Sequence, residues 1–108
     1  MSNDTPVLDT IADITAVSIE HSSLSPREFM LVRMAALIAM DAPPASYLAN
    51  APAGAEAGLN AADVQGVMIA VAPVVGTPRV VAAGGHILRA LGLAIAVDDA
   101  EMANQVDG

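Results

Sequence analysis

The chain has 108 residues, of which 55% are hydrophobic and 2% aromatic, and it carries a formal net charge of −8 with no cysteine. Four basic residues cannot form the positive face that binds nucleic-acid phosphates, and no disulfide framework or thiol chemistry is available. A domain of this size buries only about two-thirds of the surface of its unfolded chain. Because the chain is so apolar, a monomer would expose hydrophobic patches of several hundred Å², which usually mark an interface. We therefore expect one domain over residues 1–108 that assembles as a homo-oligomer.

The acidic residues gather at the two ends of the chain, at about residues 1–20 and 98–108, whereas acidic and basic residues balance between them. We interpret these flanks as solubilising. The N-terminus lacks a basic segment followed by an apolar run, and the longest apolar stretches are too short or too interrupted to span a bilayer. A cytoplasmic protein without a membrane segment is therefore expected.

The opening residues 4–22 predict an amphipathic first helix, whose apolar side carries Val7, Leu8, Ile11, Ile14 and either Val17 or Ser18. The second helix has a complete start signal. Ser25 is placed as N-cap, Pro26 as the first helical residue and Glu28 as the third, which forms a capping box. This helix should end near Asp41, because Pro43 disfavours the helical conformation at Ala42.

The third helix is expected from Pro44, with a break or kink at Pro52 and an end at Gly58. Asn60 and Asp63 predict a second capping box, which begins a fourth helix that breaks at Pro73.

Thr77 and Pro78 begin a fifth helix, which should end at about Leu91 with Gly92 as its cap. Inside it, Gly84 and Gly85 favour another helix crossing at close range, in the same subunit or a neighbour. Because no strand-like alternation is present, we predict an all-α bundle of about five helices.

Few polar groups of the central region could take part in chemistry. Arg33 lies among apolar residues and needs a carboxylate, carbonyl groups or a ligand anion. Arg79 lies in the first turn of a helix, where the dipole does not favour a cation, which indicates a similar partner. His86 is the best candidate for an acid–base group, although a lone helical histidine is more often a structural residue. No metal-ligand spacing, nucleophile elbow or phosphate loop occurs, so no metal and no cofactor are expected.

The order of these signals resembles the carboxymuconolactone decarboxylase family, which includes the alkylhydroperoxidase-D-type proteins. Three places carry the likeness: Arg27-Glu28 at the start of an alanine-rich helix, "AGLNAADV" after a small-residue helix, and "APVVGTPRV" at the following joint. The resemblance covers about residues 25–91. It implies an alkylhydroperoxidase-D-like helical fold and assembly as a trimer or hexamer.

The redox branch of this family carries a C-x-x-C-x-x-x-H motif before the glycine that corresponds to Gly58. Counting back from Gly58 places Pro43, Ser46 and Asn50 where the cysteines and the histidine would stand. Thiol peroxidase chemistry needs a thiolate and is excluded for a chain without cysteine. Asn50 can form hydrogen bonds but cannot carry a proton, and it could equally cap a helix segment that restarts at Pro52.

Two hypotheses for the function remain, and they leave open whether the protein is an enzyme. In the first, a pocket near residues 43–50 binds, or acts on, a small apolar carbonyl or lactone compound. Ser46, Tyr47 and Asn50 would form hydrogen bonds, Arg33 or Arg79 would hold an anionic group, and His86 would carry protons. In the second, the chain is a catalytically inert helical oligomer that acts as a scaffold or interaction module.

Overall fold

The structure is a computed structural model that describes the backbone of residues 5–107 and the side chains of residues 5–92. Its described residues form five helices and no strand, which confirms the predicted all-α fold. The helices are α1 (Pro6–His21), α2 (Pro26–Ala39), α3 (Pro44–Glu56), α4 (Ala61–Val75) and α5 (Thr77–Asp107).

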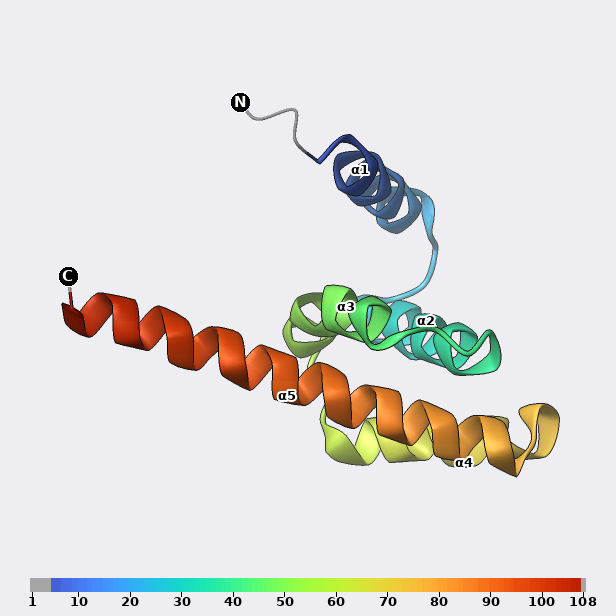
Figure 1. Cartoon of the computed structure of the whole chain (residues 1–108). Helices are drawn as coiled ribbons and strands as arrows, with labels where there is room; N and C mark the ends of the chain where they lie inside the picture. Colours follow the sequence, from blue (N-terminus) through green and yellow to red (C-terminus); the bar gives the residue numbers. More distant parts are fainter. Residues whose placement is uncertain (1–4, 108) are drawn as a thin grey trace.

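Helices α2 to α5 form the packed body of the molecule (Figure 1). Helix α5 packs against α3 and α4, and α2 packs against α4 and α3. Helix α1 stands apart from this body, and the second half of α5 extends beyond it (Figure 1). The molecule therefore measures 50 × 30 × 24 Å along its principal axes.

Both predicted capping boxes are confirmed. The Ser25 hydroxyl accepts a hydrogen bond from the backbone N–H of Glu28, and the Glu28 carboxylate accepts one from the backbone N–H of Ser25. Asn60 and Asp63 make the same two bonds at the start of α4. Each box satisfies two N–H groups that the first helical turn would leave without partners, so both helix starts are determined locally.

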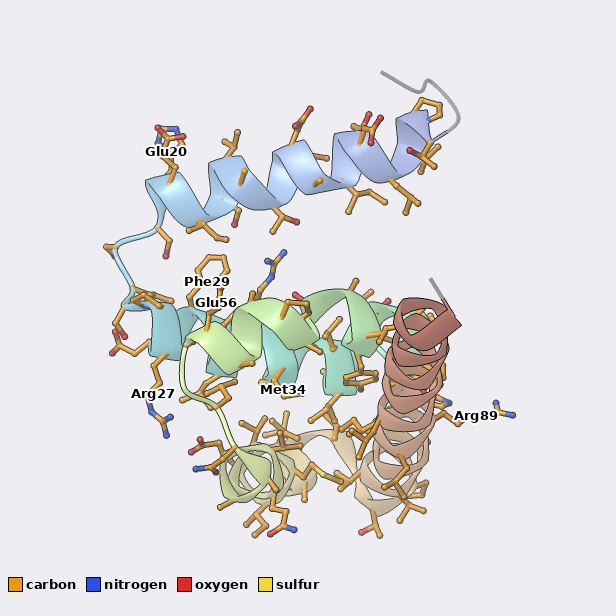
Figure 2. All side chains as sticks on the ribbon, turned by 90° about the vertical axis from the view of Figure 1, so that its left-hand side faces the viewer. Glu20, Arg27, Phe29, Met34, Glu56 and Arg89 are labelled. Carbon is orange, nitrogen blue, oxygen red and sulfur yellow. The ribbon has the colours of Figure 1, made fainter. Side chains whose placement is uncertain are left out.

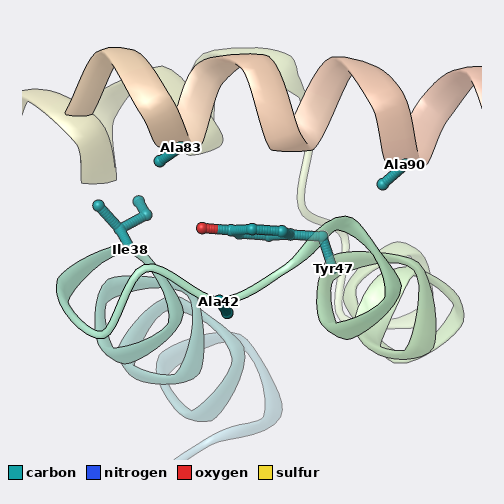
Figure 3. Close-up of a cluster of buried hydrophobic side chains, with 5 residues drawn as sticks. All are labelled: Ile38, Ala42, Tyr47, Ala83 and Ala90. Atoms are coloured by element: carbon teal, nitrogen blue, oxygen red, sulfur yellow. The ribbon is translucent and has the colours of Figure 1, made fainter. Parts of the chain in front are cut away.

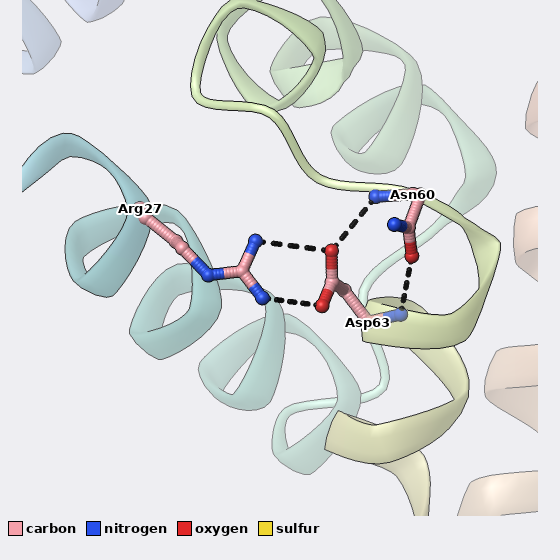
Figure 4. Close-up of polar contacts among 3 residues, drawn as sticks. All are labelled: Arg27, Asn60 and Asp63. Atoms are coloured by element: carbon pink, nitrogen blue, oxygen red, sulfur yellow. Dashed lines mark hydrogen bonds and ion pairs between the residues drawn. The ribbon is translucent and has the colours of Figure 1, made fainter.

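An ion pair joins these two helix starts (Figure 4). The Arg27 guanidinium donates two hydrogen bonds to the Asp63 carboxylate, one of them 3.1 Å long, while Asp63 also caps α4. The bond from Arg27, and after it the backbone N–H of Asn60, lower the pKa of Asp63. One carboxylate therefore both starts α4 and links it to α2.

The predicted helix breaks at two prolines do not occur. Helix α3 runs through Pro52, and α4 continues past Pro73 to Val75. Each proline lacks the N–H of one helical hydrogen bond, but the bonds on either side of it maintain the helix. Gly76, with a φ of 93°, then turns the chain between α4 and α5.

The predicted end of the fifth helix at Leu91 is also wrong, because α5 continues through Gly92 to Asp107. A helical glycine costs about 1 kcal/mol relative to alanine. The apolar and alanine residues on both sides of Gly92 favour the helix and outweigh that cost.

Nearer its start, α5 presents Gly84 to α4, where an added Cβ would lie 3.4 Å from Met68 Cε, whereas Gly85 faces open space. Gly84 therefore faces α4 at ordinary van der Waals contact distance, and the close helix crossing stays a prediction.

A small core lies where α2, α3 and α5 meet (Figure 3). The Tyr47 ring lies at its centre, with Ile38 beyond its hydroxyl and the methyl groups of Ala83 and Ala90 on the α5 side. Ile38 is fully buried, and the other core residues, Ala42 among them, retain at most 6% of their surface exposed. The small α5 residues allow that helix to approach Tyr47 closely.

We predict that Asp63→Asn lowers the free energy of unfolding near neutral pH, because asparagine cannot form the ion pair with Arg27. Since the pKa of Asp63 is lower in the folded protein, its contribution is complete above about pH 4, the range of an unperturbed aspartate, and is lost as the pH falls through the lowered value. The difference between wild type and variant should therefore shrink below about pH 4.

Urea unfolding at a series of pH values from 7 to 3 measures this difference. Glu56→Gln, which removes an exposed carboxylate from α3, is the matched control and should show no such pH-dependent gap. A gap between wild type and Asp63→Asn that stays constant over the whole series would contradict the assignment.

Candidate functional site

The turn between α2 and α3 positions the candidate site. It begins with a Schellman motif, in which the N–H of Ala42 bonds to the carbonyl of Leu37 and the N–H of Asp41 bonds to that of Ile38. Asp41 takes the left-handed position of this motif, with a φ of 57°. The same motif ends α3, but there the left-handed residue is Gly58, at 81°. A glycine would avoid the strain at Asp41, so the carboxylate there calls for an explanation.

Tyr47 lies in the first turns of α3 and directs its ring into the core (Figure 3). Its hydroxyl is buried and has no hydrogen-bond partner in the described part of the chain. Burial, and after it the negative charge of Asp41, raise the pKa of this hydroxyl. Tyr47 is therefore a neutral group whose O–H can donate a hydrogen bond that no described residue accepts.

His86, on α5, faces the same turn. Its Nδ1 atom lies 3.8 Å from Asp41 Oδ1, close enough for an ion pair when the imidazole is protonated but beyond hydrogen-bond length. This atom is buried and, like the Tyr47 hydroxyl, lacks a hydrogen-bond partner among the described residues. The rest of the ring reaches solvent, since 30% of the side chain is exposed.

We call Asp41, Tyr47 and His86 the Asp41 cluster. It combines a hydroxyl donor, an imidazole that can accept or donate a proton, and a carboxylate that can pair with the protonated imidazole. A buried polar atom without a partner costs about 1–3 kcal/mol, and the Tyr47 hydroxyl and His86 Nδ1 are the two buried side-chain atoms without a partner among the described residues. The described residues contain no group of side chains that could hold a metal ion.

Three of the other predicted site residues, Arg33, Arg79 and Asn50, make their contacts outside this cluster. The Arg33 guanidinium lies over the Phe29 ring, 5.1 Å from its centre. Arg79 donates a 3.3 Å hydrogen bond to the carbonyl of Ala39, at the C-terminal end of α2. That end carries the negative pole of the α2 dipole, which explains a cation in the first turn of α5.

Asn50 lies inside α3 and donates a 2.8 Å hydrogen bond from its side-chain amide to the carbonyl of Ser46. The alternative prediction that Asn50 caps a segment restarting at Pro52 is therefore wrong, because α3 does not restart there. Asn50 and Ser46 are both half-buried, and the bond between them uses one of the two N–H donors of the Asn50 amide.

Two hollows lie away from the Asp41 cluster. An open groove of about 390 Å³ separates the end of α1 from α2 and α3, and a shallower one of about 360 Å³ lies over α4 and the start of α5. The first is lined by Ile19, Leu24, Pro26, Phe29, Met30, Ala53, Glu56 and Ala57. The pocket expected near residues 43–50 is neither of these hollows.

Comparison with known proteins decides the family. The sequence model of the carboxymuconolactone decarboxylase family matches residues 6–85. The chain belongs to the carboxymuconolactone decarboxylase family. The matched range includes α1 to α4 and the first turns of α5, and it ends one residue before His86. Asp41 and Tyr47 therefore lie inside the family region, whereas His86 lies just outside it.

No curated protein and no solved structure matches the chain. None of the described helices is both long enough and apolar enough to cross a membrane.

Asp41 is the member of the cluster that the sequence interpretation missed as a site residue. Its position before Ala42 and two prolines was used only to predict the end of α2. One signal in the sequence could have indicated it: an aspartate follows the end of a helix, at the position where glycine is usual.

We predict that Tyr47→Phe raises the melting temperature of the protein or leaves it unchanged. The substitution keeps the ring in the core and removes a buried hydroxyl that has no described partner. Tyr47→Ala should instead cost about 3–5 kcal/mol, because it leaves a cavity the size of an aromatic ring. Thermal unfolding followed by circular dichroism distinguishes the two, and a large loss of stability in Tyr47→Phe would show that the hydroxyl has a partner in the free protein.

Proposed function

We propose that this member of the carboxymuconolactone decarboxylase family binds a small apolar carbonyl or lactone compound at the Asp41 cluster and exchanges protons with it. Two observations support the proposal most: the Tyr47 hydroxyl and His86 Nδ1 are both buried without hydrogen-bond partners among the described residues, and His86 Nδ1 lies 3.8 Å from Asp41 Oδ1. A ligand carbonyl oxygen is the acceptor that the Tyr47 hydroxyl lacks.

The roles follow from the chemistry of each group. The Tyr47 O–H donates a hydrogen bond to the carbonyl oxygen of the ligand, and this bond becomes stronger as negative charge develops on that oxygen. The imidazole of His86 removes a proton from the carbon next to the carbonyl, and the resulting imidazolium pairs with Asp41. The electron pair of the broken C–H bond becomes the enolate, and return of the proton to carbon completes the exchange. No thiol takes part, in agreement with the absence of cysteine.

A second candidate function is a catalytically inert oligomer that serves as a scaffold or interaction module. It is favoured by the separate partners of Arg33, Arg79 and Asn50, none of which joins a shared site. The two functions differ in one respect that can be measured, because only the first requires a ligand at the Asp41 cluster.

We predict that δ-valerolactone binds the wild-type protein and that tetrahydropyran, the same ring without the carbonyl group, binds more weakly. Since one hydrogen bond contributes about 1 kcal/mol, Tyr47→Phe should weaken lactone binding about 5-fold and leave tetrahydropyran binding unchanged. Isothermal titration calorimetry measures both affinities. Ser23→Ala, which removes an exposed hydroxyl outside the cluster, is the control and should behave as wild type.

The same ligand tests the proton transfer. In D₂O, the hydrogens next to the lactone carbonyl should exchange faster with wild-type protein than without it, and His86→Gln should abolish this acceleration while the protein still binds lactone. Proton NMR of the lactone follows the exchange. Equal affinity for the two ring compounds, together with no exchange, would leave the inert oligomer as the better account.

A further inference from the structure

Helix α1 stands apart from the packed body, and none of its 16 residues is buried among the residues that the structure describes. Its large apolar side chains are instead between 50% and 69% exposed. These are Val7, Leu8, Ile11, Ile14, Val17 and Ile19. An isolated helix of this length is only marginally stable in water, because helices in proteins are stabilised mainly by packing of an apolar face. The apolar side of α1 therefore calls for a surface that covers it.

The apolar and acidic residues of α1 lie on opposite sides of the helix. Because successive residues turn by about 100°, Val7, Ile11 and Ile14 fall within about 60° of one another. The acidic residues of the helix share the other side: Asp9, Asp13 and Glu20. The Glu20 side chain accordingly points away from the body (Figure 2). A surface that covers the apolar side would leave every carboxylate of α1 in water.

Helix α2 carries an apolar stripe on the side from which Phe29 projects toward α1 (Figure 2). Phe29, Val32, Ala36 and Met40 recur at intervals of three and four residues and so share this side of the helix. Val32 is 58% exposed and Met40 70% exposed, and Ala36 is exposed as well. We call these four residues the α2 stripe. It is a second uncovered apolar surface, about as long as the one on α1.

The groove of about 390 Å³ lies at the start of the α2 stripe and already includes the end of α1. Ile19 and Leu24 line it together with Phe29 from α2 and Ala53 from α3. The small side chain of Ala53 leaves room for a helix to approach α3 closely. Glu56 is the one charged residue of the lining, and it is exposed to solvent. An uncharged helix face can therefore enter the groove without burying a charge.

We propose that α1 is a hinged lid that closes over this groove and over the α2 stripe of its own chain. Ile19 and Phe29 line the same groove, and their positions set the register of two antiparallel helices. Since both helices rise about 1.5 Å per residue, Ile11, eight residues before Ile19, comes beside Ala36, seven residues after Phe29. The first turn of α1 then reaches Met40. In this register the apolar side of α1 covers the whole stripe.

The connection to α2 favours closure within the chain over contact with another molecule. Residues 22–25 join the two helices, and helices with so short a connection pack as antiparallel neighbours. Among the described residues, no hydrogen bond joins this connection to the body, since the N–H of Ser22 bonds to the carbonyl of Ile19 and that of Leu24 to the Ser22 hydroxyl. A tether this short gives an effective concentration on the order of millimolar, above the micromolar concentration at which a second copy would compete.

A pair of cysteines tests the closed arrangement directly, because the chain contains no other cysteine. The double variant Ile11→Cys/Ala36→Cys should form a disulfide within one chain, detected by mass spectrometry as an oxidised monomer. Asp13→Cys/Ala36→Cys is the matched control. Since Asp13 lies on the outer side of α1, this control should close about 10-fold more slowly or not at all. A disulfide that forms only between chains, or closure of both variants at the same rate, would overturn the proposal.

Hydrogen exchange followed by mass spectrometry tests the same closure without a crosslink. The backbone amides of α1 should exchange about 10-fold more slowly in wild type and in Ala16→Gln than in Ile14→Gln, because Ile14 lies on the apolar side and Ala16 on the acidic side. This protection should persist on dilution, since the lid and its groove belong to one chain. Wild-type α1 that exchanges as fast as that of Ile14→Gln contradicts the lid. Protection that disappears on dilution would also overturn it, because a second copy would then be the cover.

Discussion

The structure depends on the left-handed turn at Asp41. This residue ends α2, places Ala42 in the core and directs α3 back so that Tyr47 lies between α2 and α5. Glycine performs the same task at Gly58 without strain, whereas a left-handed aspartate costs on the order of 1 kcal/mol. This strained residue places its carboxylate 3.8 Å from His86 Nδ1, and its negative charge helps to raise the pKa of the Tyr47 hydroxyl. Fold and candidate chemistry therefore share one backbone constraint, and neither can be changed there independently.

Much of the fold could be predicted from the sequence because its signals act over a few residues. Ser25 with Glu28, and Asn60 with Asp63, form their bonds inside a single helical turn, so the residue types and their spacing determine both helix starts. The errors arose where two local preferences oppose each other. Pro52, Pro73 and Gly92 each disfavour a helix, but the residues around them favour one, and in each case the helix continues through the position.

The candidate site was predicted only in part, because its contacts join residues that are distant in sequence. Tyr47 and His86 were selected for their chemistry, but nothing in the sequence shows that both face Asp41. Arg79 meets the carbonyl of Ala39, forty residues earlier, and such a partner depends on how α2 and α5 cross. A backbone carbonyl also leaves no trace in the sequence, since every residue has one. For this reason the sequence predicted that Arg79 has a partner but did not predict that the partner is the carbonyl of Ala39.

The two kinds of unsatisfied group in this chain call for partners of different size. A buried hydroxyl at Tyr47 and a buried nitrogen at His86 each lack one hydrogen bond, which a few polar atoms can supply. The apolar face of α1 lacks a surface the length of a helix, which no small molecule can cover. Binding at one site therefore does not replace binding at the other. Since α1 joins the body through residues 22–25, next to the start of α2, covering α1 would also hold the helix that carries Asp41 at its other end.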